Sequence, residues 1–188
     1  QLKKQIEIKI SNEKEIVYLT SYYNMEIYVA QKLKELASVR TKDFADIEEE
    51  IKELEKEINI KYDTKQKEAI SLAMNTNVLV ITGGPGTGKT TTINSIISFF
   101  EKRGKEVYLA APTGRAAKRM TETTNREAKT IHRLLEIAYS KDDLNQKFLR
   151  NEEYPLECDV IIVDETSMID INLMYHLLKA VPEGVRLI

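Results

Sequence analysis

Several residue types that would commit the chain to a particular class are scarce. The single cysteine, Cys158, excludes an internal disulfide framework and a cysteine-rich metal site. No apolar run approaches the ~18 residues needed to span a bilayer, and the first residues lack the apolar stretch of a secretory leader. These absences predict a cytoplasmic protein with no membrane partner.

The length and composition are those of an ordinary globular protein. The chain has 188 residues, of which 42% are hydrophobic and 31% charged. This length suits one compact domain, or one domain with a small appendage. The chain starts at Gln1 and stops within the strand-like run 185–188, so we expect it to be a piece of a longer protein.

Charge is divided unevenly along the chain, although the formal sum is only −2. Residues 101–133 carry nine basic and four acidic side chains, a net +5, which leaves −7 for the rest. The segment 42–57 is the most acidic, with eight acids against three bases. Because its isoleucines and Leu54 recur at helical spacing, we predict a solvated helix with one docked apolar stripe; a partner surface is the alternative.

The hydrophobic pattern changes near residue 62. Before it, alternation over 6–10, a return segment at 16–19 and a helical stretch from 23 to 36 predict a small α+β element. After it, apolar strand-like runs alternate with helical ones, which predicts an α/β fold with a parallel sheet flanked by helices. The expected strands are 77–82, 106–111, 159–163 and 185–188, and the expected helices are 90–100, 113–120, 131–138 and 173–181.

A phosphate-binding loop follows the first of these expected strands. Residues 83–90 read GGPGTGKT and fit the pattern G-x-x-x-x-G-K-[ST], between a strand and a helix as the motif requires. Glycines let successive N–H groups point at a phosphate, Lys89 is expected to reach the β and γ phosphates of ATP, and the hydroxyl of Thr90 to bind Mg²⁺. The residues expected to bind nucleotide here are Gly84, Pro85, Gly86, Thr87, Gly88, Lys89, Thr90 and Thr91.

Two acids close a later expected strand. The apolar run 161–163 ends in Asp164 and Glu165. In P-loop enzymes an acid at such a strand end holds Mg²⁺, and a neighbouring glutamate can act on the attacking water. We therefore expect Asp164 to be the metal partner and Glu165 the catalytic base, with Lys89 as the third catalytic residue.

Four further segments resemble motifs of one helicase family. Residues 62–70, YDTKQKEAI, look like the Q motif of superfamily 1 helicases. Residues 110–120, AAPTGRAAKRM, resemble motif Ia of the RecD/TraA branch, and residues 130–135, TIHRLL, match another element of that branch. Residues 164–168, DETSM, resemble its motif II. The resemblance covers about residues 60 to 188.

The resemblance implies the first, RecA-like motor domain of a RecD-like 5′→3′ DNA helicase, in the exodeoxyribonuclease V alpha-subunit family. The motor domain would occupy residues 59–188 and be incomplete at its C-terminus; residues 1–58 would end an N-terminal region, with a winged-helix-like hairpin and an acidic helix. Motif III and the second motor domain, with its arginine finger, would lie beyond Ile188. The chain alone is then expected to bind ATP, to hydrolyse it slowly at best, and not to unwind DNA.

The same resemblance assigns contacts and partners. Gln66 would read the adenine edge. Single-stranded DNA would cross the basic stretch and meet Pro112, Thr113, Gly114, Arg115, Lys118, Arg119, Thr130 and His132. The remaining partners would be the second motor domain of the same protein and other subunits of a nuclease–helicase complex, acting in DNA repair and recombination.

Other interpretations fit parts of the pattern. An AAA+-type ATPase that remodels protein complexes has a similar loop, but the Gln66 segment and the loop at 112–114 argue against it. A nucleotide kinase fits Asp164 and Glu165 less well, and a GTPase would need an N-K-x-D motif that is missing. A regulatory nucleotide-binding module stays open. Two roles also stay open for His132, which could contact DNA or could cap and pack. Tyr62 could stack on adenine or pack.

Overall fold

The computed structural model describes residues 5–11, 14–39, 47–84, 86–138 and 147–188. Residues 12 and 13 of the expected hairpin turn, residues 42–46 of the acidic segment and Pro85 lie outside the described residues.

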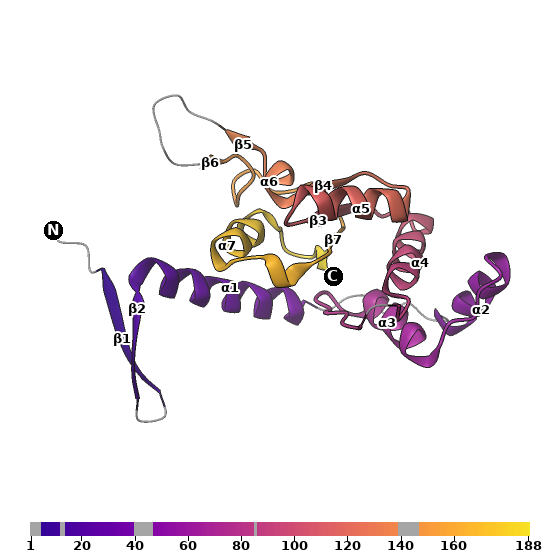
Figure 1. Ribbon diagram of the computed structural model, residues 1–188, viewed down its shortest axis with the longest axis horizontal. Helices are drawn as coiled ribbons and strands as arrows, with labels where there is room; N and C mark the ends of the chain where they lie inside the picture. The colour runs from indigo at the N-terminus through magenta and orange to yellow at the C-terminus, as the bar shows by residue number, and fades with distance from the viewer. Residues whose placement is uncertain (1–4, 12–13, 40–46, 85, 139–146) are drawn as a thin grey trace.

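A parallel sheet forms the centre of the molecule (Figure 1). Its strand order is β4-β3-β7-β8, from β3 (Val107–Ala111), β4 (Ala128–Thr130), β7 (Val160–Val163) and β8 (Arg186–Leu187). All four residues of β7 are buried, as expected for a central strand covered on both faces. The predicted α/β fold with a parallel sheet is confirmed.

Helices cover both faces of this sheet. They are α3 (Thr64–Asn75), α4 (Lys89–Lys102), α5 (Gly114–Thr124), α6 (Ile131–Leu134) and α7 (Ile171–Ala180). Side chains alternate across a strand, so Ile161 joins one core with Leu177 of α7, and Ile162 joins the other with Ile96 and Phe100 of α4. The period of two in β7 thus builds a core on each face.

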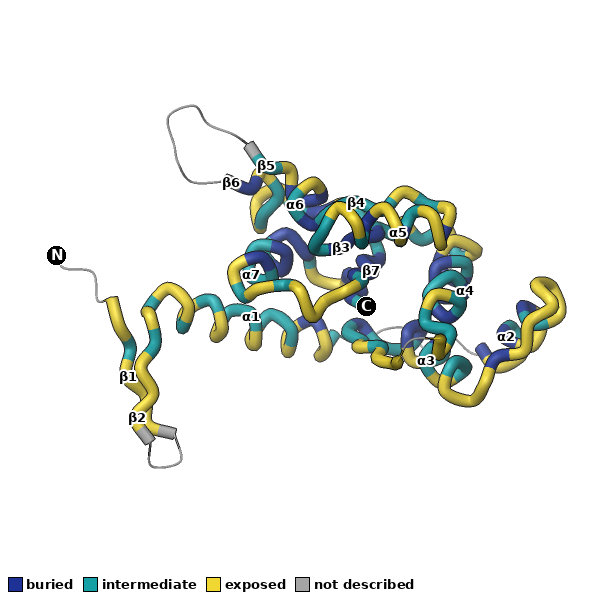
Figure 2. The backbone as a smooth tube through the Cα atoms, viewed as in Figure 1, coloured by how far each residue is buried: buried dark blue, intermediate teal, exposed yellow. Residues whose placement is uncertain are grey.

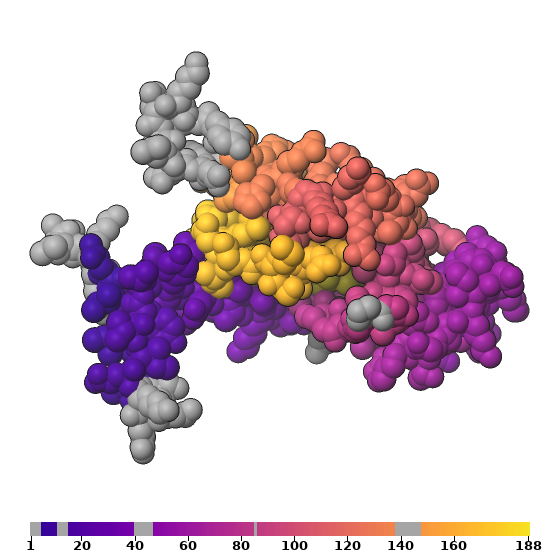
Figure 3. Space-filling model, in the orientation of Figure 1, coloured from indigo at the N-terminus to yellow at the C-terminus, as the bar shows by residue number. Residues whose placement is uncertain are grey.

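The first described element is an antiparallel hairpin, β1 (Ile6–Ser11) with β2 (Lys14–Leu19), followed by α1 (Thr20–Ser38). The hairpin stands away from the body and is largely exposed; Ile10 keeps 77% of its surface accessible (Figures 2 and 3). Alternation of this kind is typical of strands with one buried face, but nothing described covers the hairpin, so neither of its faces is buried. At its far end α1 packs against α7, and Leu36 enters the core beside it.

The acidic helix α2 (Ile47–Glu57) docks as its spacing predicted. Its apolar stripe of Ile47, Ile51 and Leu54 is buried in the core that contains α4. Its acids reach basic side chains at the end of α4: Glu50 accepts two hydrogen bonds from Arg103, at 2.6 and 2.8 Å. The proposed boundary after residue 58 stays a prediction, although Leu36 and α2 both contribute to the cores around the sheet.

The expected strand at 77–82 is only partly formed. Val78 makes an isolated parallel bridge to Leu187, with Leu79 N donating to Leu187 O at 3.0 Å. Val80 is 75% exposed, so the run is not buried on both faces. The physical reason is that β8 offers just Arg186 and Leu187 for pairing, and no described strand lies beside residues 80–82.

The expected helix at 131–138 ends early, at Leu134. Glu136 adopts a left-handed φ of 53°, which breaks the helix. The backbone then turns into β5 (Ile137–Ala138), which pairs with β6 (Lys147–Phe148). None of the helices within the described ranges is long and apolar enough to cross a membrane.

Candidate nucleotide-binding site

Helix α4 begins at Lys89, directly after the glycine-rich loop. Gly88 precedes it with a left-handed φ of 77°, and no side chain caps the first turn. The first N–H groups of a helix have no partner within the helix, and they lie at the positive end of its dipole. This N-terminus is therefore built to receive an anion such as a phosphate.

The Lys89 ammonium is folded back onto the loop. Its Nζ donates hydrogen bonds to the carbonyl oxygens of Gly83 and Gly84, the latter at 2.8 Å. Thr87 Oγ1 donates to the same Gly84 oxygen at 2.9 Å. A phosphate that bound here would offer Lys89 a stronger, charged acceptor in place of these carbonyls.

Gln66 lies against the loop and caps its own helix. Its backbone N–H donates to Asp63 Oδ1 at 2.9 Å, and its Oε1 accepts from Asp63 N at 3.0 Å, which is a reciprocal capping box. Its Nε2 reaches Gly88 O at 3.4 Å. The positive φ favours glycine at this position, and a Cβ added to Gly88 would lie 2.2 Å from that Nε2, so the Gln66 amide would have to shift. That Gln66 reads adenine stays a prediction.

Tyr62 packs rather than faces the loop. It is buried, and its hydroxyl shares a 2.6 Å hydrogen bond with Ser95 of α4. Its backbone N–H donates to Glu55 of α2 at 2.8 Å. Of the two alternatives for this ring, the structure shows packing.

The two acids end β7 at the same edge of the sheet. Glu165 has a left-handed φ of 56°, an uncommon conformation for a residue other than glycine and one that is frequent at functional sites. Its N–H donates to Asp164 Oδ1 at 2.9 Å, which leaves Oδ2 of Asp164 free of this bond. The strained turn brings both carboxylates to the cavity wall.

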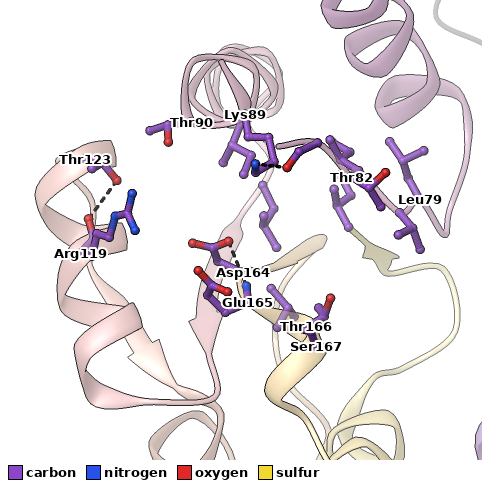
Figure 4. A pocket seen from close by; sticks show the side chains of 17 residues that line it. Leu79, Thr82, Lys89, Thr90, Arg119, Thr123, Asp164, Glu165, Thr166 and Ser167 are labelled. Atoms are coloured by element: carbon purple, nitrogen blue, oxygen red, sulfur yellow. Dashed lines mark hydrogen bonds between the residues drawn. The ribbon is translucent and has the colours of Figure 1, made fainter. Parts of the chain in front are cut away.

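These parts enclose one cavity of about 540 Å³ (Figure 4). Because parallel strands end at a common edge, the phosphate loop, Asp164 and Glu165 meet there although they are far apart in sequence. Four of the predicted residues line the cavity: Lys89, Thr90, Asp164 and Glu165. Its lining also includes residues that sequence reasoning did not assign to it, namely Arg119, Thr123, Thr166 and Ser167.

Of these four residues, Arg119 matters most for the function of the cavity. The sequence placed it with the DNA-contacting residues, whereas the structure places it on the cavity wall beside Thr123. The two residues are four apart on α5, so helical periodicity could have indicated that they share a face. A contact between Arg119 and DNA stays a prediction.

The other expected DNA residues of this region surround the start of α5. Thr113 caps the helix, accepting from Ala116 N at 3.2 Å. Arg115 and Lys118 are exposed and line a shallow surface hollow with Arg119 and Glu122. Pro112 and Gly114 flank the cap in the loop after β3. The side chains of Arg115 and Lys118 are therefore accessible to solvent and to a ligand.

Ion pairs divide the basic stretch into two parts. At the far end of α4 and beyond, four of its cations are paired: Lys102 with Glu57, Arg103 with Glu50, Lys105 with Asp159 and Arg126 with Glu101. On α5, Lys118 has only a 3.9 Å approach to Glu122, and no ion pair within the described ranges involves Arg115 or Arg119. Among the described residues, Arg115 and Arg119 of α5 therefore keep unneutralised positive charge, as does the exposed Arg133 of α6.

Thr130 and His132 lie at the neighbouring strand end. Thr130 caps α6 by accepting from Arg133 N at 3.2 Å. The half-buried His132 ring is 6.0 Å from the ring of Phe148, which corresponds to the packing alternative. A DNA contact by either residue stays a prediction.

Comparison with known proteins agrees with this geometry. A sequence profile of the AAA domain matches residues 66–188, which is well over half of the chain. This chain belongs to the AAA domain family. The match begins at Gln66 and includes the phosphate loop, α5 and the acidic end of β7.

The relatives of this chain include two proteins named DNA helicases and a subunit of the RecBCD enzyme. The chain is 48% identical to the ATP-dependent RecD2 DNA helicase of Deinococcus radiodurans over 111 residues, 59% of this chain and 15% of that protein. It is 33% identical to the RecBCD enzyme subunit RecD of Buchnera aphidicola subsp. Schizaphis graminum, over 92% of this chain and 32% of the relative. It is 36% identical to the ATP-dependent DNA helicase dda of Enterobacteria phage T4, over 62% of this chain and 28% of the relative.

The chain is therefore RecD-like, and it spans less than a third of the length of the relatives named here. These relatives do not favour the alternative of a machine that remodels protein complexes.

Proposed function

We propose that this chain is the ATP-binding motor domain of a RecD-like DNA helicase, which couples ATP hydrolysis to movement along single-stranded DNA. The observation that supports it most is the cavity at the carboxyl edge of the sheet. There the uncapped start of α4, Lys89 and the two acids Asp164 and Glu165 converge. Its relatives' names supply the helicase and DNA parts of the proposal.

In this proposal the phosphates of ATP occupy the N-terminus of α4. Gly86 and Gly88, both at positive φ, let the loop direct its N–H groups inward. Lys89 exchanges the carbonyls of Gly83 and Gly84 for phosphate oxygens. Gln66, whose Nε2 lies 3.4 Å from Gly88 O beside the loop, is assigned to the adenine base.

The donor set also fits Mg²⁺. Thr90 offers a hydroxyl and Asp164 a carboxylate on opposite walls of one cavity, and Mg²⁺ prefers oxygen ligands shared between a few protein groups and phosphates. Among the residues that the structure describes, no three His, Cys, Asp or Glu side chains form a metal cluster, which is consistent with an ion that depends on the nucleotide. When bound, such an ion neutralises charge on the transferring phosphate.

Hydrolysis is assigned to Glu165. Its carboxylate accepts a proton from a water molecule as the water oxygen bonds to the γ-phosphorus and the bond to the β–γ bridging oxygen breaks, releasing ADP. Single-stranded DNA would lie across the loop after β3 and along the exposed side of α5. The repair and recombination role, the second motor domain and any nuclease–helicase subunits belong to the same proposal.

Binding of labelled DNA tests the DNA part directly. We expect an end-labelled single strand to bind the chain at low salt and to dissociate as salt rises, because phosphate contacts release counterions. Arg115→Ala and Lys118→Ala should each weaken binding and lower the slope of log affinity against log salt by about 0.7 per lost phosphate contact. Lys52→Ala, an exposed cation of α2, is the charge-matched control. No binding at low salt, or equal losses in all three variants, would contradict a DNA surface on α5.

A further inference from the structure

Arg119 is shared by two hollows of the molecule. It lines the nucleotide cavity with Lys89, Thr90 and Asp164, and it also borders the surface hollow formed by other charged side chains of α5. Figure 4 shows its side chain directed from α5 toward the space between Thr90 and Asp164. This position differs from that of Arg115, which borders the outer hollow only.

Hydrogen bonds fix the part of α5 that carries Arg119 to the helix that follows the phosphate loop. Asn94 of α4 donates through Nδ2 to the carbonyl oxygen of Thr123 at 3.0 Å. The Thr123 hydroxyl in turn donates to the carbonyl oxygen of Arg119 at 2.9 Å. Because Asn94 lies about one turn beyond Thr90, the backbone of Arg119 is held in register with the start of α4.

The cavity contains a second cationic side chain besides Lys89. Its lining contains two carboxylates, on Asp164 and Glu165, and two cationic side chains, Lys89 and Arg119. Lys89 is held by two loop carbonyls, whereas Arg119 forms no ion pair with any described residue and is exposed toward the cavity. A guanidinium offers a fixed fork of donors that matches two phosphate oxygens.

We propose that Arg119 binds the terminal phosphate of ATP and so lets this site distinguish ATP from ADP; this rests on the proposed function. The first phosphates lie at the start of α4, so the γ-phosphate lies farther out, toward Asp164 and Glu165. Arg119 borders that side of the cavity. Since Arg115 and Lys118 lie within about one turn of it on the same helix, one rigid element carries both the phosphate contact and the proposed DNA contacts.

Paired nucleotide titrations test the assignment. The probes are a fluorescent, non-hydrolysable ATP analogue and the matching ADP analogue, each with Mg²⁺, on the 188-residue chain. Arg119→Ala should weaken the triphosphate analogue about tenfold or more, the scale of one charge-assisted contact, and change the diphosphate analogue by no more than about twofold. Arg119→Lys, which keeps the charge but loses the fork, should lie between wild type and Arg119→Ala. Lys52→Ala is the control for a general loss of charge.

The outcomes separate this inference from the proposed function. Equal losses for both nucleotides, or no loss, in Arg119→Ala would overturn it, as would a loss of single-stranded DNA affinity as large as that of Arg115→Ala with ATP affinity unchanged. If Lys89→Ala abolishes binding of both nucleotides while Arg119→Ala behaves as wild type, only this inference fails. If wild type binds neither nucleotide, both fail. A thermal melt of each variant checks folding, which an exposed arginine should not affect.

Discussion

The two edges of the sheet differ in whether their charged groups are paired. At the carboxyl edge, α4 starts without a side-chain cap, Arg119 is unpaired among described residues, and two carboxylates face a cavity. At the amino edge several charged side chains are paired with one another. Asp159, just before β7, accepts hydrogen bonds from Lys105 Nζ at 2.8 Å and from Glu106 N at 2.9 Å. Arg126 donates two hydrogen bonds of 2.6 Å to the Glu101 carboxylate.

This contrast assigns different roles to residues of the same type. Ion pairs at the amino edge tie the end of α4 and the starts of β3, β4 and β7 together, and so contribute to stability. Unpaired donors and carboxylates at the carboxyl edge contribute little to the folded state, and they are free for a ligand. Variants at the carboxyl edge should change binding most, whereas variants at the amino edge should change stability only.

Two glycines with the same backbone conformation give the largest expected effect. Gly88 (φ 77°) stands before α4 against Gln66, whereas Gly104 (φ 67°) follows α4, and a methyl group added to it would meet nothing within 4 Å. Each change to alanine should lower the free energy of unfolding by roughly 1–2 kcal/mol, because alanine disfavours positive φ. Gly88→Ala should in addition weaken ATP binding at least about tenfold, since alanine strains the backbone at the start of α4 and displaces the Gln66 amide.

Urea titration and nucleotide binding on the two variants measure this difference. Gly104→Ala should keep wild-type affinity for ATP because it lies at the amino edge. Equal affinities for ATP in Gly88→Ala and Gly104→Ala would break the contrast between the edges.

Much of this contrast could be read from the sequence, and part of it could not. The loop at 83–90 and the acids after 161–163 were predicted because local pattern decides them: glycines before a helix, and acids after a buried strand. The pairing of residues 77–82 could not be predicted, because it depends on the length of β8, a strand far along the chain. The early end of α6 likewise follows from the pairing of the residues after it with residues 147–148.

The site, too, was only partly predictable from the sequence. Motifs predicted Lys89, Thr90, Asp164 and Glu165, which line the cavity. Arg119 was assigned to DNA because its segment resembles a DNA-contacting motif and lies in the basic stretch. The cavity on which it lies forms only when α5 packs on α4 through Asn94 and Thr123. Which face a helical residue presents is a tertiary property, so a motif match alone could not decide it.

A smaller effect is expected from pH at the amino edge. The hydrogen bond from Lys105 holds the pKa of Asp159 below its usual value, with a further contribution from Glu106 N–H. A carboxyl group whose pKa is lowered by folding stabilises the protein above its unfolded pKa of about 3.9, and this contribution is lost as the pH falls through the folded value.

Asp159→Asn should therefore flatten the fall of the urea midpoint between neutral and acidic pH. The difference should be below about 1 kcal/mol, because the pair is partly exposed and screened by solvent. Affinity for ATP near neutral pH should stay unchanged. A loss of ATP affinity in this variant would show that the two edges are not independent.

Backbone amide NMR of the chain, titrated with the Mg²⁺ complex of a non-hydrolysable ATP analogue, tests the central claim most directly. We predict that the largest shifts fall on residues 86–91 and 164–165, and that they vanish in Lys89→Ala. Residues 105–107 and 159–160, at the amino edge, should not move. Largest shifts at the amino edge, or shifts at residues 86–91 that persist in Lys89→Ala, would contradict the account.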